Sequence, residues 1–433
     1  MGNADQTAPR HPNAETSPSC SGDCGSGPAM TANNRSAMTE RGCAMRTRSG
    51  RVVRFEEVVL PASKSESNRA LMIAAYGGFA PDFQNLSDSG DTMVLSEALR
   101  KAQSGESIID IADCGTAARF LTTYLACHEG NWLLTGTDRM KQRPMAPLVE
   151  ALRSLGAEVQ YVENEGCLPL HIKGKTISGG KVQMDTTCSS QFASSLLLAA
   201  PMWPQGLEMD LVGHLSSVPY LQMTLAMMRH FGAECELQGE RVVVSPKPYE
   251  PMGFAVDPDR SAASYWYEMA AFSEECEIRL HGLAGSGTSL IQGDAIIAEW
   301  MTHLGVGTFV DGNDLILRKI PFEKRPLSFD FFDHPDLYPT LVATCAGLHV
   351  EACFTGLDNL HLKESDRVEA MQQELAKLGE PEIHFCAHGD HRIVMALAPL
   401  SMLVGPVAFD HPEVVAKSYP SFWNDTSFLH ILP

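Results

Sequence analysis

The sequence predicts an α/β protein of two domains, assembled from six repeating units that each hold two helices separated by short strands. The chain has 433 residues, which is more than a single compact core usually accommodates. Helix patterns that end in glycine recur at spacings of 76, 73 and 74 residues, and more apolar helix patterns recur in step with them at 74, 72, 75 and 55 residues. Self-similarity at a fixed period indicates copies of one supersecondary unit.

The first series of helices is amphipathic, and a short strand follows each member. The glycine that ends each helix stands where the chain needs a left-handed C-cap, a conformation that glycine adopts without steric cost. The helix patterns are APLVEALRSLG, LQMTLAMMRHFG, AIIAEWMTHLG and RVEAMQQELAKLG, and their glycines are Gly156, Gly232, Gly305 and Gly379.

The second series is nearly wholly apolar, as in SSLLLAA, LVATCAG and MALAPL, and a helix that is apolar all round is buried. These helix patterns begin at Gly115, Ser189, Ser261, Asp336 and His391. Helix N-termini carry free N–H groups and the positive end of the helix dipole. If several of them converge on one cleft, they form an anion site.

Two units are predicted to be shortened. The last spacing of 55 residues is short by about one strand pair, and KAQSGESIIDIA leaves little room between the helices of the first unit. An unrelated α/β solenoid is the alternative architecture for a repeat of this length.

Residues 1–50 differ from the rest of the chain because they contain no Val, Ile, Leu, Phe, Trp or Tyr. Such a segment cannot bury enough apolar surface to offset its ordering entropy, so we expect it to be disordered. A transit peptide and a start codon placed too early remain open, since Met45 directly precedes the first residues of folded character. We expect residues 1–44 to be dispensable for stability and activity.

Composition excludes several classes of protein. The net charge of −20 repels nucleic acid, and no apolar run approaches the 18 residues of a membrane span. The twelve cysteines are scattered, with no His or Cys cluster at zinc-ligand spacing, as expected of reduced thiols inside a cell. We therefore expect a cytoplasmic protein that needs no metal and no organic cofactor. Separately, we expect a monomer.

Nine motifs place Lys, Arg, Ser and carboxylate side chains at corresponding points of successive units. A single charged turn is often solvated surface, but together the motifs predict one anion site shared between the domains. The motifs are LPASKSESNRAL (60–71), DCGTAARF (113–120), RMKQRP (139–144), CSSQF (188–192), SSVPY (216–220), HPDLYPT (334–340), NLHLKESDR (359–367), GDHR (389–392) and VAKSYP (415–420).

In content and order these motifs resemble the signatures of the 5-enolpyruvylshikimate-3-phosphate synthases, from about residue 51 to 425. The resemblance implies the two-domain enolpyruvyl transferase fold, with three βαβαββ units in each domain around buried helices and a pseudo-threefold axis. It also implies that residues 51–62 and 258–433 form one domain, that residues 63–257 form the other, and that the active site lies in the cleft between them.

The implied reaction transfers the enolpyruvyl group of phosphoenolpyruvate to the 5-hydroxyl of shikimate 3-phosphate by addition and elimination, with release of phosphate. By resemblance, Lys64, Asp336 and Glu364 are catalytic. We expect Asp336 to act as the base for the alcohol and Glu364 as the proton shuttle at the methylene carbon, although the division of roles between the two carboxylates stays open.

The resemblance also assigns the substrate contacts, residue by residue. The implied shikimate 3-phosphate contacts are Lys64, Ser65, Arg69, Ser189, Ser190, Gln191, Ser217, Tyr220, Asp336, Asn359 and Lys363. The implied phosphoenolpyruvate contacts are Lys64, Gly115, Arg143, Gln191, Arg367, Arg392 and Lys417.

The sequence departs from the family pattern at three places. Ala62 stands where glycine is usual, Asp113 where asparagine is frequent, and the stretch 380–390 lacks about one strand pair. A carboxylate beside the phosphoenolpyruvate pocket would repel that anion, so we expect Asp113→Asn to lower the KM for phosphoenolpyruvate. Asp113 could instead be neutralised by Arg119 or another cation of the pocket.

Three other readings are weighed against this one. UDP-N-acetylglucosamine enolpyruvyl transferases share the fold but use a Lys-Asn pair near the start, whereas this chain has Lys64-Ser65. A relative of the RNA cyclases would need a basic surface, which the net charge of −20 opposes. A non-catalytic binder of shikimate-pathway anions is disfavoured because the acid, the base and most of the cations are present.

Overall fold

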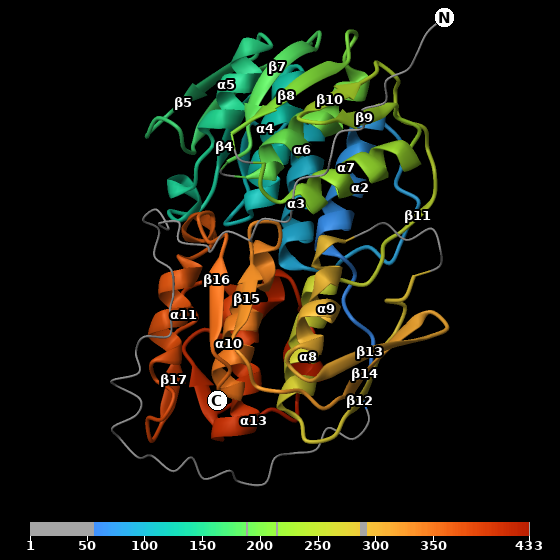
Figure 1. Ribbon diagram of the computed structural model, residues 1–433. Helices are drawn as coiled ribbons and strands as arrows, with labels where there is room; N and C mark the ends of the chain where they lie inside the picture. Colours follow the sequence, from blue (N-terminus) through green and yellow to red (C-terminus); the bar gives the residue numbers. More distant parts are fainter. Residues whose placement is uncertain (1–55, 188, 214, 286–291, 433) are drawn as a thin grey trace, which may run out of the picture.

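The computed structural model describes residues 56–187, 189–213, 215–285 and 292–432 (Figure 1). The predictions for residues 1–50 lie outside the described residues. Figure 1 shows two lobes, one formed by the blue-to-green part of the chain and the other by the yellow-to-red part together with the first strand, β1.

The first lobe holds three units, and each unit contains one pair of parallel strands. The first unit consists of β11 (Phe254–Ala255), α2 (Lys64–Gly77), β2 (Phe83–Gln84) and α3 (Gly90–Gln103). The second consists of β3 (Ile108–Asp110), α4 (Gly115–Cys127), β4 (Gly130–Thr135), α5 (Ala146–Ser154), β5 (Glu158–Tyr161) and β6 (Leu170–Gly174). The third consists of β7 (Gly180–Asp185), α6 (Ser190–Ala199), β8 (Leu207–Val212), α7 (Val218–His230), β9 (Cys235–Gln238) and β10 (Arg241–Val244).

The second lobe repeats this plan. Its first unit consists of β1 (Glu56–Val58), α8 (Arg260–Phe272), β12 (Glu277–Leu280), α9 (Ile297–Thr302), β13 (Val306–Asp311) and β14 (Asp314–Lys319). Its second consists of β15 (Leu327–Asp330), α10 (Tyr338–Leu348), β16 (Ala352–Thr355) and α11 (Arg367–Leu375). Its third consists of β17 (Ile383–Phe385), α12 (His391–Leu397), β18 (Val407–Phe409) and α14 (Phe422–Asp425).

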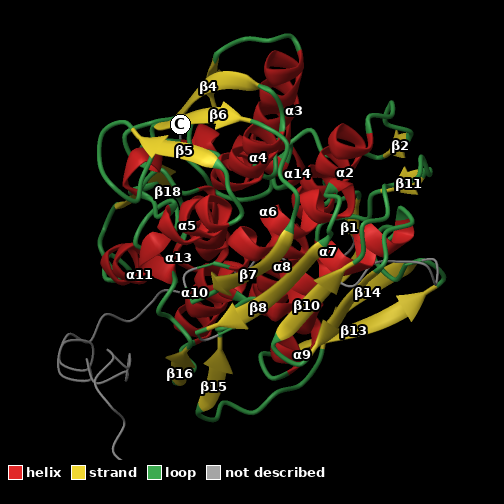
Figure 2. Cartoon of the chain, turned by 90° about the horizontal axis from the view of Figure 1, so that it is seen from above, coloured by secondary structure: helices red, strands yellow, loops and turns green. Residues whose placement is uncertain are grey.

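Each complete unit forms a four-stranded sheet in which the parallel pair is extended by an antiparallel hairpin. The strand orders are β3-β4-β6-β5, β7-β8-β10-β9 and β1-β12-β14-β13. Figure 2 looks down on the first lobe and shows its sheets at the outside, with helices such as α4 and α6 between them. The predicted α/β architecture of repeating two-helix units is therefore confirmed.

The predicted helix ends are also confirmed. Gly156, Gly232, Gly305 and Gly379 have φ angles of +91°, +86°, +87° and +100°, which is the left-handed region that a side chain would disfavour. The apolar series corresponds to α4, α6, α8, α10 and α12, and the residues of these helices are nearly all buried.

The predicted shortening of the first and last units is confirmed, but a further unit is shortened as well. Within the described residues, three units contain only a parallel pair: β11-β2, β15-β16 and β17-β18. The first unit is abridged as predicted, because α3 ends at Gln103 and β3 starts at Ile108. The strand pair missing near residue 380 belongs to the unit of β15 and β16, since α11 ends at Leu375 and β17 starts at Ile383 with no hairpin between them.

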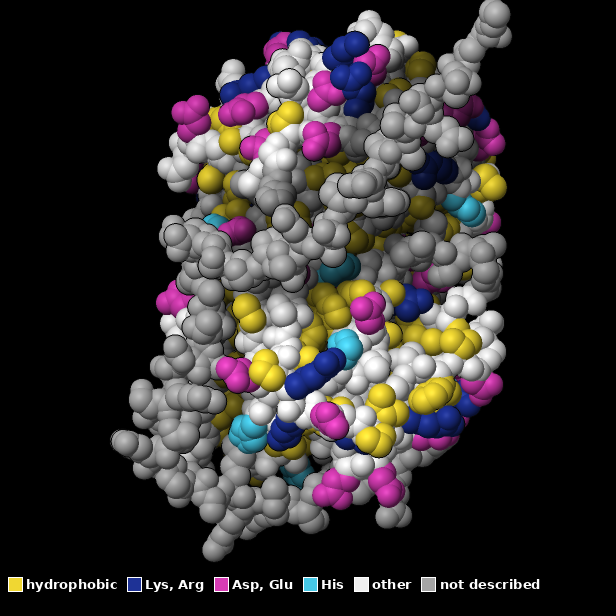
Figure 3. All heavy atoms as spheres, in the orientation of Figure 1, with side chains coloured by type: hydrophobic (Ala, Val, Ile, Leu, Met, Phe, Trp, Pro, Cys, Tyr) yellow, Lys and Arg dark blue, Asp and Glu magenta, His cyan; other side chains and the backbone are white. Residues whose placement is uncertain are grey.

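Two hydrophobic cores underlie the two lobes. One runs from Ala62 to Val256, and the other combines Val58 and Leu60 with residues 262–429. None of the helices in the described ranges combines the length and apolar character that a bilayer-spanning segment requires. On the face shown in Figure 3, acidic and basic side chains are interspersed over the described surface of both lobes.

Candidate active site

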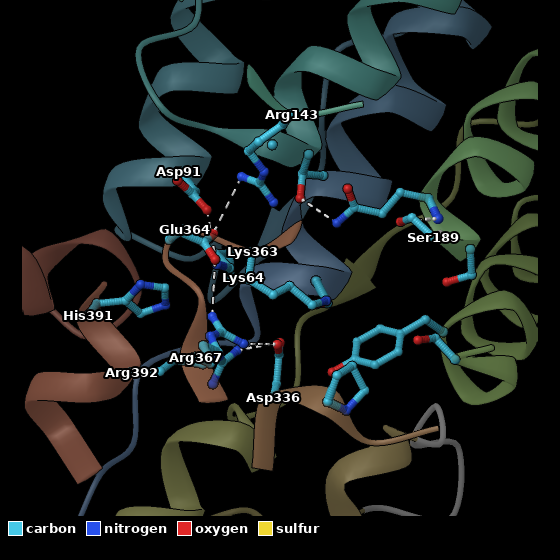
Figure 4. A pocket seen from close by; sticks show the side chains of 18 of the residues that line it. Lys64, Asp91, Arg143, Ser189, Asp336, Lys363, Glu364, Arg367, His391 and Arg392 are labelled. Atoms are coloured by element: carbon cyan, nitrogen blue, oxygen red, sulfur yellow. Dashed lines mark hydrogen bonds and ion pairs between the residues drawn. The ribbon is translucent and has the colours of Figure 1, made fainter. Parts of the chain in front are cut away.

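A polar cavity of about 80 Å³ lies between the two cores, and Figure 4 shows its charged side chains directed toward one another. Both cores contribute to its lining. The lining residues are Lys64, Ser65, Arg69, Asp91, Gly115, Thr116, Arg143, Ser189, Ser190, Gln191, Ser217, Tyr220, Pro335, Asp336, Lys363, Glu364, Arg367, His391 and Arg392.

The N-termini of several helices meet at this cavity. Lining residues begin or cap α2, α4, α6, α7, α11 and α12, namely Lys64, Gly115, Ser190, Ser217, Arg367 and His391. Free backbone N–H groups and the positive ends of the helix dipoles therefore point toward one small volume. This convergence explains how a protein of net charge −20 can bind anions.

Arg367 lies at the centre of a network of ion pairs. Its guanidinium is 2.9 Å from Asp336 Oδ1, 3.0 Å from Glu364 Oε2 and 2.8 Å from Asp390 Oδ2. Arg392 approaches Asp336 Oδ2 to 2.6 Å, and Arg143 is 3.7 Å from Glu364 Oε1. Two carboxylates from neighbouring loops are thus held between three guanidinium groups.

These guanidinium groups keep both carboxylates ionised. Burial alone would raise the pKa of Asp336, but Arg392 and Arg367 outweigh it and hold that pKa well below its usual range. Burial likewise opposes ionisation of Glu364, and Arg143 and Arg367 reverse the effect, so its pKa also lies well below normal. Paired carboxylates in a cation-rich cleft are candidates for proton transfer.

A second chain of charges connects the two lobes through Asp91. Its Oδ2 is 2.9 Å from Lys64 Nζ, and its Oδ1 is 2.9 Å from Lys417 Nζ. Burial raises the pKa of Asp91, but the two ammonium groups outweigh it and lower the pKa overall. Lys417 also reaches Asp113 Oδ2 at 2.8 Å. Both lysines are therefore fixed by one buried carboxylate.

Gly115 allows two cations to approach the start of α4. A Cβ atom built on Gly115 would lie 2.6 Å from an Nη1 of Arg119 and 2.7 Å from Nη1 of Arg143. Arg119 donates to the carbonyl of Gly115 at 3.0 Å and to that of Pro144 at 3.2 Å. Any larger residue at position 115 would displace these guanidinium groups from the cavity.

Hydroxyl and amide groups line the opposite wall. Ser189 Oγ accepts from the Gln191 backbone N–H at 3.2 Å and so caps α6, and Gln191 Nε2 donates to Thr116 Oγ1 at 3.3 Å. Ser217 has a left-handed backbone with φ +58°, which is unusual for a residue with a side chain and is frequent at functional sites. The Tyr220 hydroxyl donates to Asp294 at 3.3 Å.

Comparison with known proteins agrees with this geometry. The family model for EPSP synthase (3-phosphoshikimate 1-carboxyvinyltransferase) matches residues 82–426. The 3-phosphoshikimate 1-carboxyvinyltransferase of Bacteroides fragilis strain YCH46 is 42% identical over 389 residues, covering 85% of this chain and 93% of the relative. The chain belongs to the EPSP synthase family.

More distant comparisons agree. The 3-phosphoshikimate 1-carboxyvinyltransferase of Haemophilus influenzae strain PittEE is 32% identical over 419 residues, covering 84% of this chain and 94% of the relative. The solved structure of EPSP synthase from Acinetobacter baumannii superimposes with a TM-score of 0.65 at 20% identity, covering 88% of this chain and 97% of that chain. At this sequence identity, the structural similarity shows a shared fold and nothing more.

The cavity brings together nearly all of the residues that sequence analysis assigned by resemblance to EPSP synthases. Two of them do not line it. Lys417 contacts the cavity residue Asp91, and Asn359 donates to Ser216 Oγ at 3.1 Å across the two cores. Among the described residues, no group of three or more His, Cys, Asp and Glu side chains is arranged to hold a metal ion.

Two titratable residues of the cavity, Asp91 and His391, were not predicted as site residues from the sequence. Asp91 sits in the first turn of α3, and only its acidic character after Gly90 could have indicated a role. His391 lies in the GDHR motif, where Arg392 alone is assigned a substrate contact by the resemblance. Burial lowers the pKa of His391 well below its usual range, and Lys64 and Arg392 add to the effect, so the imidazole is neutral.

Of the two alternatives for Asp113, the structure favours neutralisation by a cation of the pocket, because its carboxylate is paired with Lys417 at 2.8 Å. Asp113→Asn should therefore weaken phosphoenolpyruvate binding, since Lys417 loses one of its two anchoring carboxylates. The pair is partly solvated, with 45% of the Asp113 side chain exposed, so a two- to fivefold rise in KM, about 0.4–1 kcal/mol, is expected.

Steady-state KM values for both substrates would check this, and the KM for shikimate 3-phosphate should move less. The matched control is Asp138→Asn, an exposed acid in the loop that follows β4. A lower KM for phosphoenolpyruvate in Asp113→Asn would restore the original prediction.

Proposed function

We propose that the protein transfers the enolpyruvyl group of phosphoenolpyruvate to the 5-hydroxyl of shikimate 3-phosphate and releases phosphate. The observation that carries the proposal is the pair of carboxylates, Asp336 and Glu364, held beside Lys64 in one cavity rich in guanidinium groups. The two relatives described above are named 3-phosphoshikimate 1-carboxyvinyltransferase, which is this activity.

The addition step and the elimination step each need two proton transfers. In the addition step, Asp336 takes the proton of the 5-hydroxyl, and the oxygen attacks C2 of phosphoenolpyruvate. Glu364 delivers to the methylene carbon a proton that it gains once the substrate anions share its guanidinium partners. In the elimination step, Glu364 takes a proton back from the new methyl group, the C2–O bond to phosphate breaks, and the proton held by Asp336 passes to the departing phosphate. The cations stabilise the negative charge that builds on the substrates.

The residues fall into two proposed substrate regions. The first region would bind shikimate 3-phosphate. It consists of polar residues at the starts of α6 and α7 together with residues from other elements, namely Ser189, Ser190, Gln191, Ser217, Tyr220, Ser65, Arg69, Asn359 and Lys363. The cations beside Gly115 would bind phosphoenolpyruvate through Arg143, Arg367, Arg392 and Lys417, with Gln191 between the two regions.

The two hydrophobic cores support a division into two domains, residues 51–62 with 258–433 and residues 63–257. We propose that these domains close over the substrates and expel water, which strengthens every electrostatic interaction in the site. We further propose a monomer that works in the cytoplasm.

The deciding experiment measures phosphate release when the protein is mixed with phosphoenolpyruvate and shikimate 3-phosphate. Release that requires both substrates, with formation of the enolpyruvyl ether, supports the proposal. Release with UDP-N-acetylglucosamine as the acceptor would move the chain to the sister activity. Tight binding of shikimate 3-phosphate without turnover would make it a non-catalytic relative.

The reaction is expected to need no metal ion. The cavity already supplies Lys64, Arg143, Arg367 and Arg392 to neutralise the substrates. Prolonged treatment with EDTA, followed by the phosphate-release assay in metal-free buffer, should leave the rate unchanged. Activity that disappears with the chelator and returns with a divalent cation would contradict this expectation.

Binding of shikimate 3-phosphate is expected to weaken in alkali. Burial lowers the pKa of Lys363 to about 8 in the free protein, so this side chain loses its charge as the pH rises through 8. The value of kcat/KM for shikimate 3-phosphate, which reports groups of the free enzyme, should fall by up to about tenfold per pH unit above that point. Arginine keeps its charge above pH 12, so Lys363→Arg should flatten the decline. If kcat/KM fell with pH in Lys363→Arg as steeply as in the unaltered protein, another group would be responsible for the decline.

A further inference from the structure

The chain passes between the two cores twice, and the two crossings lie side by side. The first runs through Ala62 and Ser63, and the second runs through Asp257 and Pro258. The Ser63 N–H donates to the Asp257 carbonyl at 2.8 Å, and Ala62 forms an isolated bridge with Pro258. Any opening of the lobes must bend these two crossings together.

Opening is required because the cavity is small. Its volume is about 80 Å³, whereas sites for small ligands typically measure about 300–1,000 Å³. Two phosphorylated substrates cannot enter unless the lobes separate and then close again. The groups that define the closed position of the crossings therefore influence catalysis.

Glu66 lies within the hinge that these crossings form. It stands in the first turn of α2, two residues after Lys64, and is fully buried. Its Oε2 accepts from the Asp257 backbone N–H at 3.0 Å, and its Oε1 accepts from Gln292 Nε2 at 2.9 Å. One carboxyl oxygen of Glu66 is therefore bonded to the crossing segment at Asp257, and the other is bonded to Gln292 of the second lobe.

Gln292 extends this connection into the second lobe. Its Nε2 also donates to the Pro258 carbonyl at 3.0 Å, and its Oε1 accepts from the Arg260 backbone N–H, the first residue of α8, at 2.9 Å. Hydrogen bonds thus run from the start of α2, which carries Lys64, to the start of α8.

A buried carboxyl group is costly, and apolar residues of similar size often stabilise a fold better. Burial, with smaller contributions from the carboxylates of Asp257 and Asp259, raises the pKa of Glu66 to about 8. Arg69 and Arg260 are the nearby cations, but their guanidinium groups donate to Thr224 and to backbone carbonyls, including that of Leu283. The position of Glu66 is thus explained by its two hydrogen bonds across the hinge.

We propose that Glu66 and Gln292 form an interdomain tie that sets the closed position of the lobes and thereby places Lys64 and Ser65 against the substrates. Glu66 is a positioning residue and touches no reacting atom. The inference rests on the proposed function for its kinetic readout, and it has a second readout in the shape of the protein.

The test variant is Glu66→Gln. An amide offers one acceptor oxygen where the carboxyl group offers two, so its NH2 group would face the NH2 group of Gln292. The rescue variant is the exchange Glu66→Gln with Gln292→Glu, in which the amide of residue 66 donates to the carboxylate of residue 292. That carboxylate still accepts from the Arg260 N–H, but its other oxygen faces the Pro258 carbonyl, which is also an acceptor, so that bond is lost and a repulsive contact replaces it.

The control is Glu268→Gln. Glu268 is equally buried, but it lies in α8 among residues of the second core, and within the described part of the chain neither of its carboxyl oxygens has a hydrogen-bond partner. Its substitution makes the same chemical change away from the hinge. We expect its kinetics and shape to match those of the unaltered protein.

The measurements are kcat/KM for both substrates and the radius of gyration from small-angle scattering, with and without saturating shikimate 3-phosphate and phosphoenolpyruvate. In Glu66→Gln, kcat/KM should fall by about tenfold or more, because one buried donor loses its acceptor. The compaction on addition of substrates should shrink. The exchange variant should recover part of the lost kcat/KM, since the hydrogen bond between residues 66 and 292 is restored while the bond to the Pro258 carbonyl is not.

The outcomes separate the two proposals. If the unaltered protein shows neither turnover nor compaction, the proposed function fails. If the unaltered protein turns over and compacts, and Glu66→Gln behaves like Glu268→Gln, the tie is refuted while the function stands. If Glu66→Gln does not fold, the exchange variant decides: a folded exchange variant without recovery of kcat/KM refutes the tie.

Discussion

Replacing Glu364 with glutamine is expected to lower kcat by about 10²–10⁴-fold, the usual contribution of a group that transfers a proton in the transition state. The amide keeps the size of the carboxylate, and its oxygen still accepts from Arg367, which lies 3.0 Å from Glu364 Oε2 in the structure. It cannot deliver a proton to the methylene carbon or take one back. Single-turnover phosphate release with saturating substrates measures this loss directly.

The loss must be separated from general damage to a buried charge cluster. Glu268→Gln makes the same substitution at a buried glutamate of the same core and should leave kcat unchanged. Circular dichroism and the melting temperature report whether both variants fold. Near-normal kcat in Glu364→Gln would remove this residue from the proton-transfer steps and leave it a role in holding Arg143 and Arg367.

Local features of the fold could be predicted because their rules are local. A helix that ends at a glycine needs a left-handed residue there, and Gly156 and Gly379 both adopt that conformation. Apolar helices such as α6 and α12 are buried regardless of their neighbours. The period of the repeat then determines how many units there are.

Pairing between distant segments could not be predicted from the same patterns. β1 lies at residues 56–58 but pairs with β12 at residues 277–280, so the unit that they share is divided between two parts of the chain. The short spacing of 55 residues predicts a missing strand pair, but it does not show to which unit that pair belongs. The spacing in the sequence revealed a deletion, but not all of the sheets that lack a hairpin.

In the candidate site, too, local features could be predicted from the sequence, whereas contacts between distant segments could not. The polar residues at helix starts were found from the sequence, since each motif combines a cap with a charge. The partner of Asp113 was not, because Lys417 lies 304 residues away. Glu66 has the pattern of a solvated charge in a polar motif, and only contacts to Asp257 and Gln292, 191 and 226 residues away, reveal its burial at the hinge.

The second large effect is expected for Asp336→Asn, and its two kinetic constants should move in different ways. The value of kcat should fall by about 10²–10⁴-fold because asparagine cannot accept the proton of the 5-hydroxyl. The KM for phosphoenolpyruvate should not rise. Asp336 now neutralises Arg367 at 2.9 Å and Arg392 at 2.6 Å, and its removal leaves both guanidinium groups more attractive to an anion.

The same geometry explains how a carboxylate with a very low pKa can serve as a base. Arg392 and Arg367 hold the pKa of Asp336 well below its usual range against the effect of burial. When the anions of phosphoenolpyruvate share these guanidinium groups, that stabilisation weakens, the pKa of Asp336 rises, and proton transfer to it becomes easier. The base would thus be strengthened only when the second substrate is in place.

Asp366→Asn is the matched control for this variant. Asp366 caps α11 by accepting from the Val368 and Glu369 N–H groups at 3.1 Å, and asparagine caps helices equally well, so kcat should stay normal. A higher KM with normal kcat in Asp336→Asn would make Asp336 a substrate-binding residue only. In that case Glu364, as the other carboxylate held by Arg367, would have to carry both proton transfers, and Glu364→Gln would abolish the addition and the elimination together.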